Sequence, residues 1–266
     1  MKLQAVREKR DIRLKDRDAR VHEDVPTGEA LDHATTEYCN RIAALQHELY
    51  ADGRFALLIV LQGRDASGKD GTIRKVFGAV NPQGCSVTAF AAPTELEARH
   101  DFLWRVHQAV PPRRMIGIFN RSHYEDVLVP RVRHGMKKKE WTRRYDAING
   151  FERLLTDEHT VVLKFMLHIS RDEQRVRLQE RVDDREKNWK FQAGDLEDRE
   201  RWDDYTAAYR SLLLHTSTDW APWYIVPADD KSVRNWLIAR RIADTLSGLR
   251  LRYPKANGDV KGLEVV

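Results

Sequence analysis

The sequence predicts an α/β fold, a parallel β-sheet flanked by helices. Short apolar runs alternate along the chain with longer segments of helical pattern, which is the order that a parallel sheet covered by helices requires. The first apolar run leads directly into a glycine-framed turn that ends in lysine and opens a helix. A strand, a glycine-rich loop and a helix in this order are typical of proteins that hold a chain of phosphates.

Five apolar runs are expected to form the strands, in chain order at residues 55–61, 86–90, 115–119, 160–169 and 223–226. The first contains only apolar residues, as expected of a strand that is buried on both faces. Helices are expected at residues 31–50, 69–80, 94–110, 139–157, 171–183, 199–216 and 232–249. The helix over 94–110 should begin with a capping box, in which Thr94 is the cap and Glu97 reaches back to it.

The 266 residues are 41% hydrophobic, which is enough for a full core, and no internal repeat or low-complexity linker divides them. We therefore expect a single domain over residues 1–266. Residues 1–30 are rich in charge and should lie as an arm over the core. Residues 254–266 should form a loose tail.

Composition and charge exclude several classes of protein. Lysine and arginine number 46 against 41 for aspartate and glutamate, so the net charge of +5 implies a mild attraction to polyanions. Cys39 and Cys85 are too few for a disulfide framework and lack metal-ligand spacing. The charged N-terminus has no apolar signal region, and no uncharged run is long enough to cross a bilayer. These observations predict a soluble, cytoplasmic protein without a membrane partner.

The loop over residues 63–69 has the chemistry of a phosphate cradle. Gly63 and Gly68 let backbone N–H groups point inward, Lys69 supplies a mobile cation, and the next helix adds its positive end. The spacing fits the P-loop pattern, but Asp70 stands where serine or threonine normally places a hydroxyl on magnesium. Asp65, inside the loop, is therefore the expected metal ligand. The alternative is a glycine-rich connection that binds nothing.

A second polar group follows the expected strand over 115–119. In a sheet of this kind the carboxyl end of that strand lies beside the phosphate loop, where polar side chains reach metal and substrate. The candidates by position are Asn120, Arg121, Glu125 and Asp126. Structural roles are the alternative, because Asn120 can close a turn and the two acids can be solvated helix residues.

Two basic groups could bind an extended anion, or could equally be solvated surfaces. One consists of Arg171, Arg175, Arg177 and Arg181 along one side of a helix, with Arg185, Lys187 and Lys190 just beyond. Such a stripe suits a lid that closes over phosphates. The other consists of Arg131, Arg133, His134, Lys137, Lys138 and Lys139 and could line a channel for a long linear anion. Binding of that kind depends strongly on salt.

Three parts of the chain together resemble family-2 polyphosphate kinases. They are GRDASGKDGT at residues 63–72, FNRSHYE at residues 119–125, and a region over 181–231 that contains RVDDREKNWKF, WDDY and STDWAPWYIVPADDK. The similarity covers roughly residues 31–249 and joins several motifs in order. It implies a thymidylate-kinase-like P-loop kinase fold with a helical lid over 171–210. It also implies phosphoryl transfer between inorganic polyphosphate and a nucleotide, with Mg²⁺.

The resemblance assigns roles to the candidate residues. Those expected to bind polyphosphate are Ala66, Ser67, Gly68, Lys69, Asp70, Gly71, Arg74, Lys75, Arg131 and Arg133. Those expected to act on the transferring phosphoryl group are Asp65, Lys69, Arg121, Arg177 and Arg181. Asn120, Arg121, Glu125 and Asp126 would contact the nucleotide, and a glutamate at 125 accompanies the use of AMP as well as ADP. Asp65 would bind Mg²⁺, with Asn120 as a weaker ligand because some relatives have aspartate there.

The expected function is a polyphosphate-dependent nucleotide kinase that phosphorylates AMP, ADP or both, reversibly. An ATP-dependent nucleoside monophosphate kinase is one alternative, against which Asp70 and the basic channel argue. A non-catalytic polyanion-binding or RNA-binding P-loop protein is the other, but binding alone needs no carboxylate such as Asp65 inside the cradle. We therefore expect no nucleic-acid partner, adenine nucleotides as substrates with guanine nucleotides left open, and a homo-oligomer. Arg185 replaces a proline that relatives often carry, which affects the lid hinge.

Overall fold

The computed structural model describes residues 1–21, 24–256, 258 and 264. Five parallel strands form one sheet in the order β2-β3-β1-β4-β5. They are β1 (Ala56–Gln62), β2 (Cys85–Ala89), β3 (Ile116–Asn120), β4 (Thr160–His168) and β5 (Trp223–Pro227). All five predicted strands are confirmed. The tail expected over 254–266 lies largely outside the described residues.

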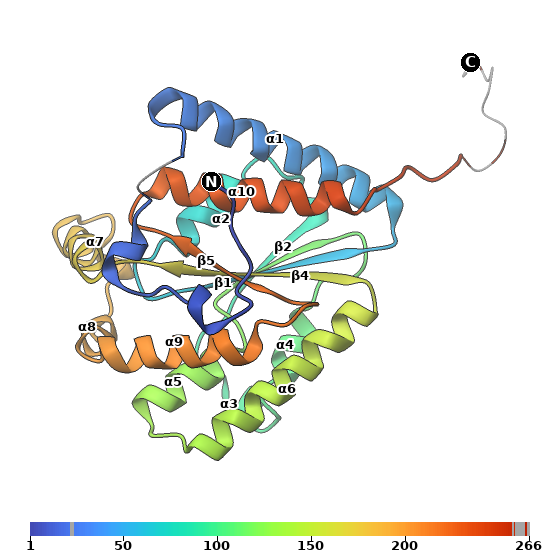
Figure 1. Ribbon diagram of the computed structural model, residues 1–266. Coiled ribbons are helices and arrows are strands. Elements are labelled where there is room, and N and C mark those ends of the chain that lie inside the picture. Colours follow the sequence, from blue (N-terminus) through green and yellow to red (C-terminus); the bar gives the residue numbers. More distant parts are fainter. Residues whose placement is uncertain (22–23, 257, 259–263, 265–266) are drawn as a thin grey trace.

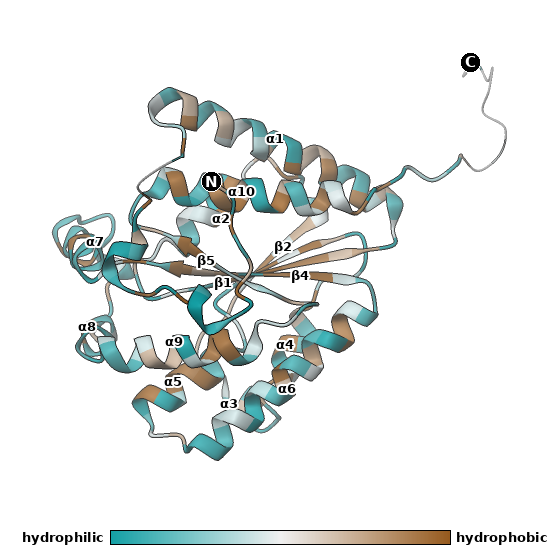
Figure 2. Ribbon diagram, viewed as in Figure 1, coloured by the Kyte–Doolittle hydropathy of each residue, from teal (hydrophilic) through white to brown (hydrophobic). Residues whose placement is uncertain are grey.

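Helices cover both faces of the sheet and form two cores (Figure 1). One face packs against α1 (Gly28–Asp52), α2 (Lys69–Phe77) and α10 (Lys231–Gly248). The other packs against α4 (Trp104–Ala109), α5 (Glu125–Arg133), α6 (Lys138–Asp157) and α9 (Trp202–Thr216). Figure 2 shows hydrophobic residues along the strands and hydrophilic ones on the outer helices.

Strand β1 lies at the centre of the sheet, which explains why it is apolar from Ala56 to Leu61, with Gln62 as the polar residue at its end. Leu57, Ile59 and Leu61 point into one core, and Leu58 and Val60 point into the other. Because side chains alternate between the two faces of a strand, a strand covered on both faces needs apolar residues at every position. The strand ends at the phosphate loop, so the two cores hold that loop in place.

The helix predicted over 94–110 is wrong as a single helix. The structure has α3 (Glu95–Ala98) and α4, separated by a turn. The predicted capping box is confirmed, since Thr94 N donates to Glu97 and Glu97 N donates to Thr94 Oγ1. Asp101 then ends the continuity, because its carboxylate and its carbonyl accept from the N–H groups of Leu103 and Trp104 and start a new helix.

Two further helices were not predicted. Helix α5 follows β3 and contains Pro130, a residue that is disfavoured within helices because it has no N–H to donate. Helix α8 (Ala193–Glu200) is separated from α9 only by Arg201. The single helix predicted over 199–216 therefore combined the last residues of α8 with the whole of α9. Before α8 lie α7 (Arg171–Asp183) and a short 3₁₀ turn, η4 (Asn188–Lys190). These elements lie beyond the carboxyl ends of the strands (Figure 1).

The N-terminal segment, residues 1–21, packs along β5 and reaches α7. Val6 N donates to the Trp223 carbonyl at 2.9 Å, and Ala5 forms a β-bridge with Tyr224. Two short 3₁₀ turns follow, η1 (Lys9–Asp11) and η2 (Asp16–Ala19). A last 3₁₀ turn, η3 (Pro82–Gly84), precedes β2. Among the helices of the described residues, none has the length and apolar character needed to cross a membrane.

Candidate active site

The phosphate loop connects β1 to α2 and depends on two glycines. Gly63 and Gly68 have φ values of 154° and 100°. A Cβ at Gly63 would lie 2.6 Å from the Leu167 carbonyl oxygen, and a Cβ at Gly68 would lie 2.0 Å from the Arg234 guanidinium. Only glycine fits at either position. Lys69 Nζ lies over the loop and donates to the Gly63 carbonyl at 2.7 Å.

Two buried arginines hold the loop from behind. Arg234 Nη1 donates to the Ser67 carbonyl at 3.2 Å, and Arg177 Nη1 donates to the Ala66 carbonyl at 3.1 Å. Because the C=O and N–H of a trans peptide point in opposite directions, fixing the Ser67 carbonyl turns the Gly68 N–H to the other side, where a phosphate is bound in such loops. Arg177 was predicted to act on the transferring phosphoryl group. In this structure it is 6% exposed and contacts the protein backbone.

Asp65 and Arg121 join the phosphate loop to the end of β3. Arg121 Nη2 lies 2.6 Å from Asp65 Oδ1, and Arg121 has a left-handed backbone with φ of 61°. Burial raises the pKa of the Asp65 carboxyl, but the charges of Lys69, Arg121 and Arg181 outweigh it and leave the pKa below its ordinary value. Asp65 is therefore ionised at neutral pH. The pair brings together two residues 56 positions apart in the chain.

Glu125 lies at the start of α5 and lines the same cavity as Asp65 and Arg121. Gln62 Nε2 donates to Glu125 Oε1 at 3.0 Å. Burial raises the pKa of Glu125, and the charges of Arg121 and Lys69 partly oppose that shift. Burial also lowers the pKa of Lys69, and so does the charge of Arg121. These groups therefore interact strongly with one another across a small space.

A cavity of about 590 Å³ opens in front of these residues. Its cationic side chains are Arg64, Arg105, Arg121 and Arg133, and its acidic ones are Asp65, Glu125, Asp126, Asp195 and Asp198. Its apolar and aromatic side chains are Phe90, Pro93, Leu128, Val129, Pro130, Tyr205 and Tyr209. This volume, with one polar end and one apolar side, is typical of a site for a small polar ligand with an apolar part.

The region of α7 and α8 closes one side of the cavity and adds a carboxylate that was not predicted. Arg181 Nη1 on α7 donates to Asp195 Oδ2 on α8 at 3.2 Å. Burial and the charge of Asp65 raise the pKa of Asp195 to about 6. Arg181, which was predicted as a site residue, therefore acts on Asp65 through its charge and contacts Asp195, which lines the cavity. No motif in the sequence indicates that Asp195 belongs to the site, because the short helix α8 that positions it was not predicted.

The remaining predicted residues are more dispersed. Asn120 Nδ2 donates to Asp70 Oδ1 at 2.7 Å, and Asp126 pairs with Arg105 at 3.1 Å. Arg133 lines the cavity but pairs with Asp198 at 2.7 Å. Arg131 stacks over the Trp141 ring at 4.4 Å, while Arg74 and Lys75 are exposed on α2, away from the cavity lining. In the basic channel expected around Arg131 and Arg133, the charge of Arg133 is thus partly neutralised by α8, while Arg131 packs against an aromatic ring of α6.

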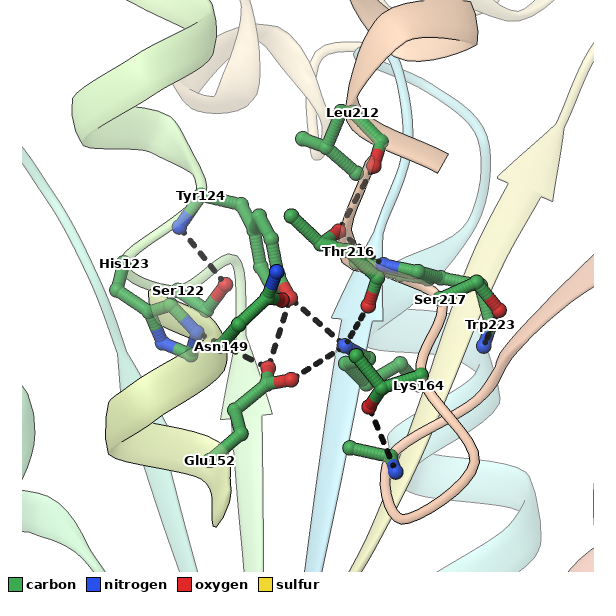
Figure 3. A network of polar contacts seen from close by, with 12 residues as sticks. Ser122, His123, Tyr124, Asn149, Glu152, Lys164, Leu212, Thr216, Ser217 and Trp223 are labelled. Carbon is green, nitrogen blue, oxygen red and sulfur yellow. Dashed lines mark hydrogen bonds and ion pairs between the residues drawn. The ribbon is translucent and has the colours of Figure 1, made fainter. Parts of the chain in front are cut away.

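The turn that carries Arg121 and Glu125 rests on a buried ion pair (Figure 3). Lys164 on β4 and Glu152 on α6 are fully buried and in direct contact. Tyr124 Oη donates to Glu152 at 2.7 Å and accepts from Lys164 at 2.8 Å, and Lys164 also donates to the Thr216 carbonyl at 2.7 Å. Burial raises the pKa of Glu152, but the charge of Lys164 keeps it below its ordinary value. The network therefore links the turn to three elements of the fold.

Comparison with known proteins places this geometry in a family. The family model for polyphosphate kinase 2 matches residues 28–252. An AMP/ADP-polyphosphate phosphotransferase of Meiothermus ruber is 55% identical over 215 residues, which cover 81% of this chain and 80% of that protein. An ADP-polyphosphate phosphotransferase of Rhodopseudomonas palustris is 45% identical over 227 residues, covering 81% and 78%.

A solved structure agrees with the sequence matches. The crystal structure of polyphosphate kinase 2 from Arthrobacter aurescens superimposes with a TM-score of 0.86 at 40% identity, covering 98% of this chain and 96% of that one. The likeness extends over the sheet, the helices on both faces and the region of α7 and α8, because nearly the whole chain is covered. The fold is thus a P-loop kinase fold, as predicted. By its sequence, its fold and its phosphate loop, the chain belongs to the polyphosphate kinase 2 family.

Proposed function

We infer that the protein transfers phosphoryl groups between inorganic polyphosphate and adenine nucleotides, forming ADP from AMP and ATP from ADP. The observation that carries this inference is the contact of Asp65 and Arg121, which joins the phosphate loop to the end of β3 at the edge of a cavity of nucleotide size. The similarity of the chain to enzymes named for this reaction also supports the inferred function. Neither an ATP-dependent nucleoside monophosphate kinase nor a non-catalytic binding protein is favoured by any contact in the site.

The two substrates would occupy opposite sides of the Asp65–Arg121 pair. The chain end of polyphosphate would bind the loop amides and Lys69, where the backbone offers donors and positive charge. The nucleotide would bind in the cavity, with its base against Phe90 and the apolar side chains of α5 and its phosphates toward Arg121. Contact with apolar and aromatic surfaces does not distinguish purines, so guanine nucleotides are the alternative acceptor.

Transfer in this site would depend on position and charge. The acceptor is a phosphate oxygen, which is largely ionised at neutral pH because the second pKa of a phosphate monoester is about 6. A general base is therefore unnecessary. Arg121, Lys69 and Arg181 would align the two substrates and stabilise the charge on the moving phosphoryl group. Arg177 and Arg234 would act as positioning residues, because they hold the loop backbone from behind.

The donor set fits a Mg²⁺ ion. Asp65 is ionised and lines the cavity, and the Asn120 amide gives its N–H to Asp70, which leaves its oxygen for a ligand. Mg²⁺ is commonly held by one or two protein oxygens together with substrate phosphates. When bound, the ion would neutralise charge on the phosphate oxygens. We propose Asp65 as its principal protein ligand and Asn120 as a weaker one.

We further propose that residues 171–210 act as a lid over both substrates, that the enzyme is cytoplasmic and that it assembles as a homo-oligomer. Two free cysteines agree with a reducing compartment. Contacts between α7 and α8 across the cavity support the lid, because Arg181 and Asp195 are held together beside Asp65. The family resemblance supports the oligomer.

The function is tested directly by offering the purified protein AMP or ADP with long-chain polyphosphate and Mg²⁺, without ATP. We expect ADP and then ATP from AMP, and ATP from ADP, identified by chromatography. Turnover only when ATP and a nucleoside monophosphate are supplied would contradict the inference and indicate an ATP-dependent kinase. No turnover under either condition, with retained polyanion binding, would indicate a binding protein.

Glu125→Gln is expected to lower kcat/KM for AMP about ten- to hundredfold more than for ADP. AMP lacks one phosphate, so its nucleoside would lie closer to Arg121 for its phosphate to reach that side chain, and Glu125 lines the cavity together with Arg121 and is held by Gln62. Loss of one hydrogen bond to a charged group has an effect of this size. Steady-state kinetics with both nucleotides measure it, with Asp126→Asn as the neighbouring control. An equal decrease for both nucleotides would disprove the assignment.

Asp195→Asn is expected to stabilise the free protein at neutral and alkaline pH. The folded pKa of about 6 lies above the ordinary value of 3.8, so the stability of the parent protein falls as pH rises from about 4 to about 6 and stays lower above that, while below about pH 4 the difference from the variant vanishes. We expect a gain in melting temperature of about 2–4 °C at about pH 8. Thermal melts without metal or nucleotide, from about pH 4 to pH 8, measure it. A difference in melting temperature between variant and parent that does not grow from about pH 4 to about pH 6 would contradict the prediction.

A further inference from the structure

A second cavity, of about 660 Å³, opens beside the N-terminal segment and takes no part in the site described above. It is lined by Ile12, Arg13, Leu14, Lys15, Arg17, Asp18 and Arg210. Four of these seven side chains are cationic and one is acidic. Arg210 comes from α9, and its guanidinium donates to the Ile12 carbonyl at 3.3 Å, so the segment and the helix form the cavity together.

The positive charge of this cavity is offset only in part by neighbouring acids. Asp18 lines the cavity and accepts from the Lys15 N–H at 2.9 Å, Asp16 accepts from the Arg171 N–H at 3.3 Å, and Asp11 interacts with the charge of Arg13. Within the described residues, no ion pair involves the cationic residues of this cavity, which are Arg13, Lys15, Arg17 and Arg210. Grouped cations without partners repel one another, and a bound anion would relieve the repulsion.

A continuous line of contacts connects this cavity to the phosphate loop. Gln174 Nε2 on α7 donates to the Asp65 carbonyl at 3.1 Å, and Arg199 Nη1 on α8 donates to Gln174 Oε1 at 3.2 Å and to the Arg171 carbonyl at 2.6 Å. Arg171 in turn contacts Asp16 of the segment through its N–H. Figure 1 shows the segment, in blue, beside α7 and α9.

The connecting path is itself basic. Burial and the charges of Arg171 and Arg175 lower the pKa of Arg199, and the charges of Asp172 and Asp16 only partly oppose that shift. Arg171 and Arg175 are exposed on α7. Arg171, Arg175 and Arg199 thus add positive charge at the start of α7, between Gln174, which contacts the phosphate loop, and Asp16 of the N-terminal segment.

We propose that this surface, formed by the cavity with Arg171, Arg175 and Arg199, binds the distal part of a long inorganic polyphosphate chain whose end lies in the phosphate loop. The proposal rests on the proposed function, because it extends the donor site along the protein. The apolar residues that line the cavity are Ile12 and Leu14, and none of the described residues lining it is aromatic. Sites for single-stranded nucleic acid use aromatic side chains to stack bases, so an unbranched chain of phosphates fits this cavity better.

The test is the combined variant Arg13→Gln, Lys15→Gln, Arg17→Gln. The three side chains are exposed, and the described contacts of these residues involve only their backbone atoms, so the fold should be unaffected. We expect KM for long-chain polyphosphate to rise about tenfold, with kcat unchanged and with kcat and KM for tripolyphosphate unchanged. Tripolyphosphate is too short to reach the cavity from the phosphate loop, so its kinetic constants should not depend on the three substituted residues.

Salt dependence gives a second readout. The slope of log KM for the long chain against log salt should fall by about two in magnitude, since each lost cation–phosphate contact removes ~0.7 for a single-stranded polyanion. The control is Arg99→Gln, Arg143→Gln, Lys255→Gln, which removes the same charge from exposed positions outside both cavities. It should leave both KM values and the slope as in the parent protein.

Several outcomes would overturn the proposal. They are an equal rise in KM for tripolyphosphate and the long chain, a rise no larger than in the control, or tighter binding of single-stranded RNA than of polyphosphate by the parent. If the parent turns over no polyphosphate, the proposed function fails. Calorimetric titration with long-chain polyphosphate alone then still decides this proposal, which requires weaker binding by the variant than by the control.

Discussion

Arg121→Ala is expected to lower kcat for phosphoryl transfer by roughly 10²- to 10³-fold, because the guanidinium is the cation placed between the phosphate loop and the nucleotide cavity. It touches Asp65 at 2.6 Å and lines the cavity with Glu125. Removing one preorganised donor of charge at a transferring group has an effect of this order. The left-handed backbone of Arg121, with φ of 61°, shows that the fold holds this residue in an unfavourable conformation.

Pre-steady-state measurement of a single turnover, with AMP or ADP bound at saturation, separates transfer from product release. Arg121→Lys keeps the charge but not the planar fork and should recover only part of the rate. Arg105→Lys is a useful comparison, since Arg105 lines the same cavity away from Asp65 and should mainly change KM. A loss confined to KM in Arg121→Ala would show that this residue only binds substrate.

Lys164→Met is expected to lower the free energy of unfolding by about 3–5 kcal/mol, because it leaves the fully buried Glu152 carboxylate without its partner. Urea denaturation measures the change. The double variant Lys164→Met, Glu152→Leu should recover most of the loss, since it removes both charges. The control is Asp157→Asn on α6, the helix that carries Glu152. It breaks the exposed pair with Arg153 and should change the free energy of unfolding by less than about 1 kcal/mol.

The same variant should also affect catalysis, because Tyr124 lies between Lys164, Glu152 and the turn that carries Arg121 and Glu125. In the double variant, restored stability with kcat still reduced would show that the network positions the turn. Full recovery of both would reduce the network to a structural role. Stability unchanged in the single variant would contradict the ion pair itself.

Local sequence was sufficient for the strands and the phosphate loop. A continuous apolar run such as 57–61 reports burial on both faces without any knowledge of partners, and glycine at 63 and 68 reports a backbone that other residues adopt poorly. The helices were less certain. A single polar residue, Asp101, divided one predicted helix, and Pro130 concealed another.

Some of the site residues could likewise be predicted from local sequence, and others could not. Asp65, Lys69, Arg121 and Glu125 follow strands within a few residues, so the topology of a parallel sheet brings them to one edge. Arg177 belongs to the basic stripe of α7 and was expected to act on the phosphoryl group because of the family resemblance. The structure turns it to the loop carbonyls, since periodicity gives the side of a helix but not what that side meets.

The fold class, the phosphate loop and the family could all be predicted from short stretches of contiguous residues, because their local patterns have one physical meaning. The roles of three other residues emerge only in the folded molecule, where Asp195 lines the cavity with Asp65, Arg234 supports the loop from α10, and Lys164 is a buried ion and not a surface lysine. These pairings join residues far apart in the chain. Their energies depend on distance and burial in the folded molecule, and neither quantity has a signature in the spacing of residues along the sequence.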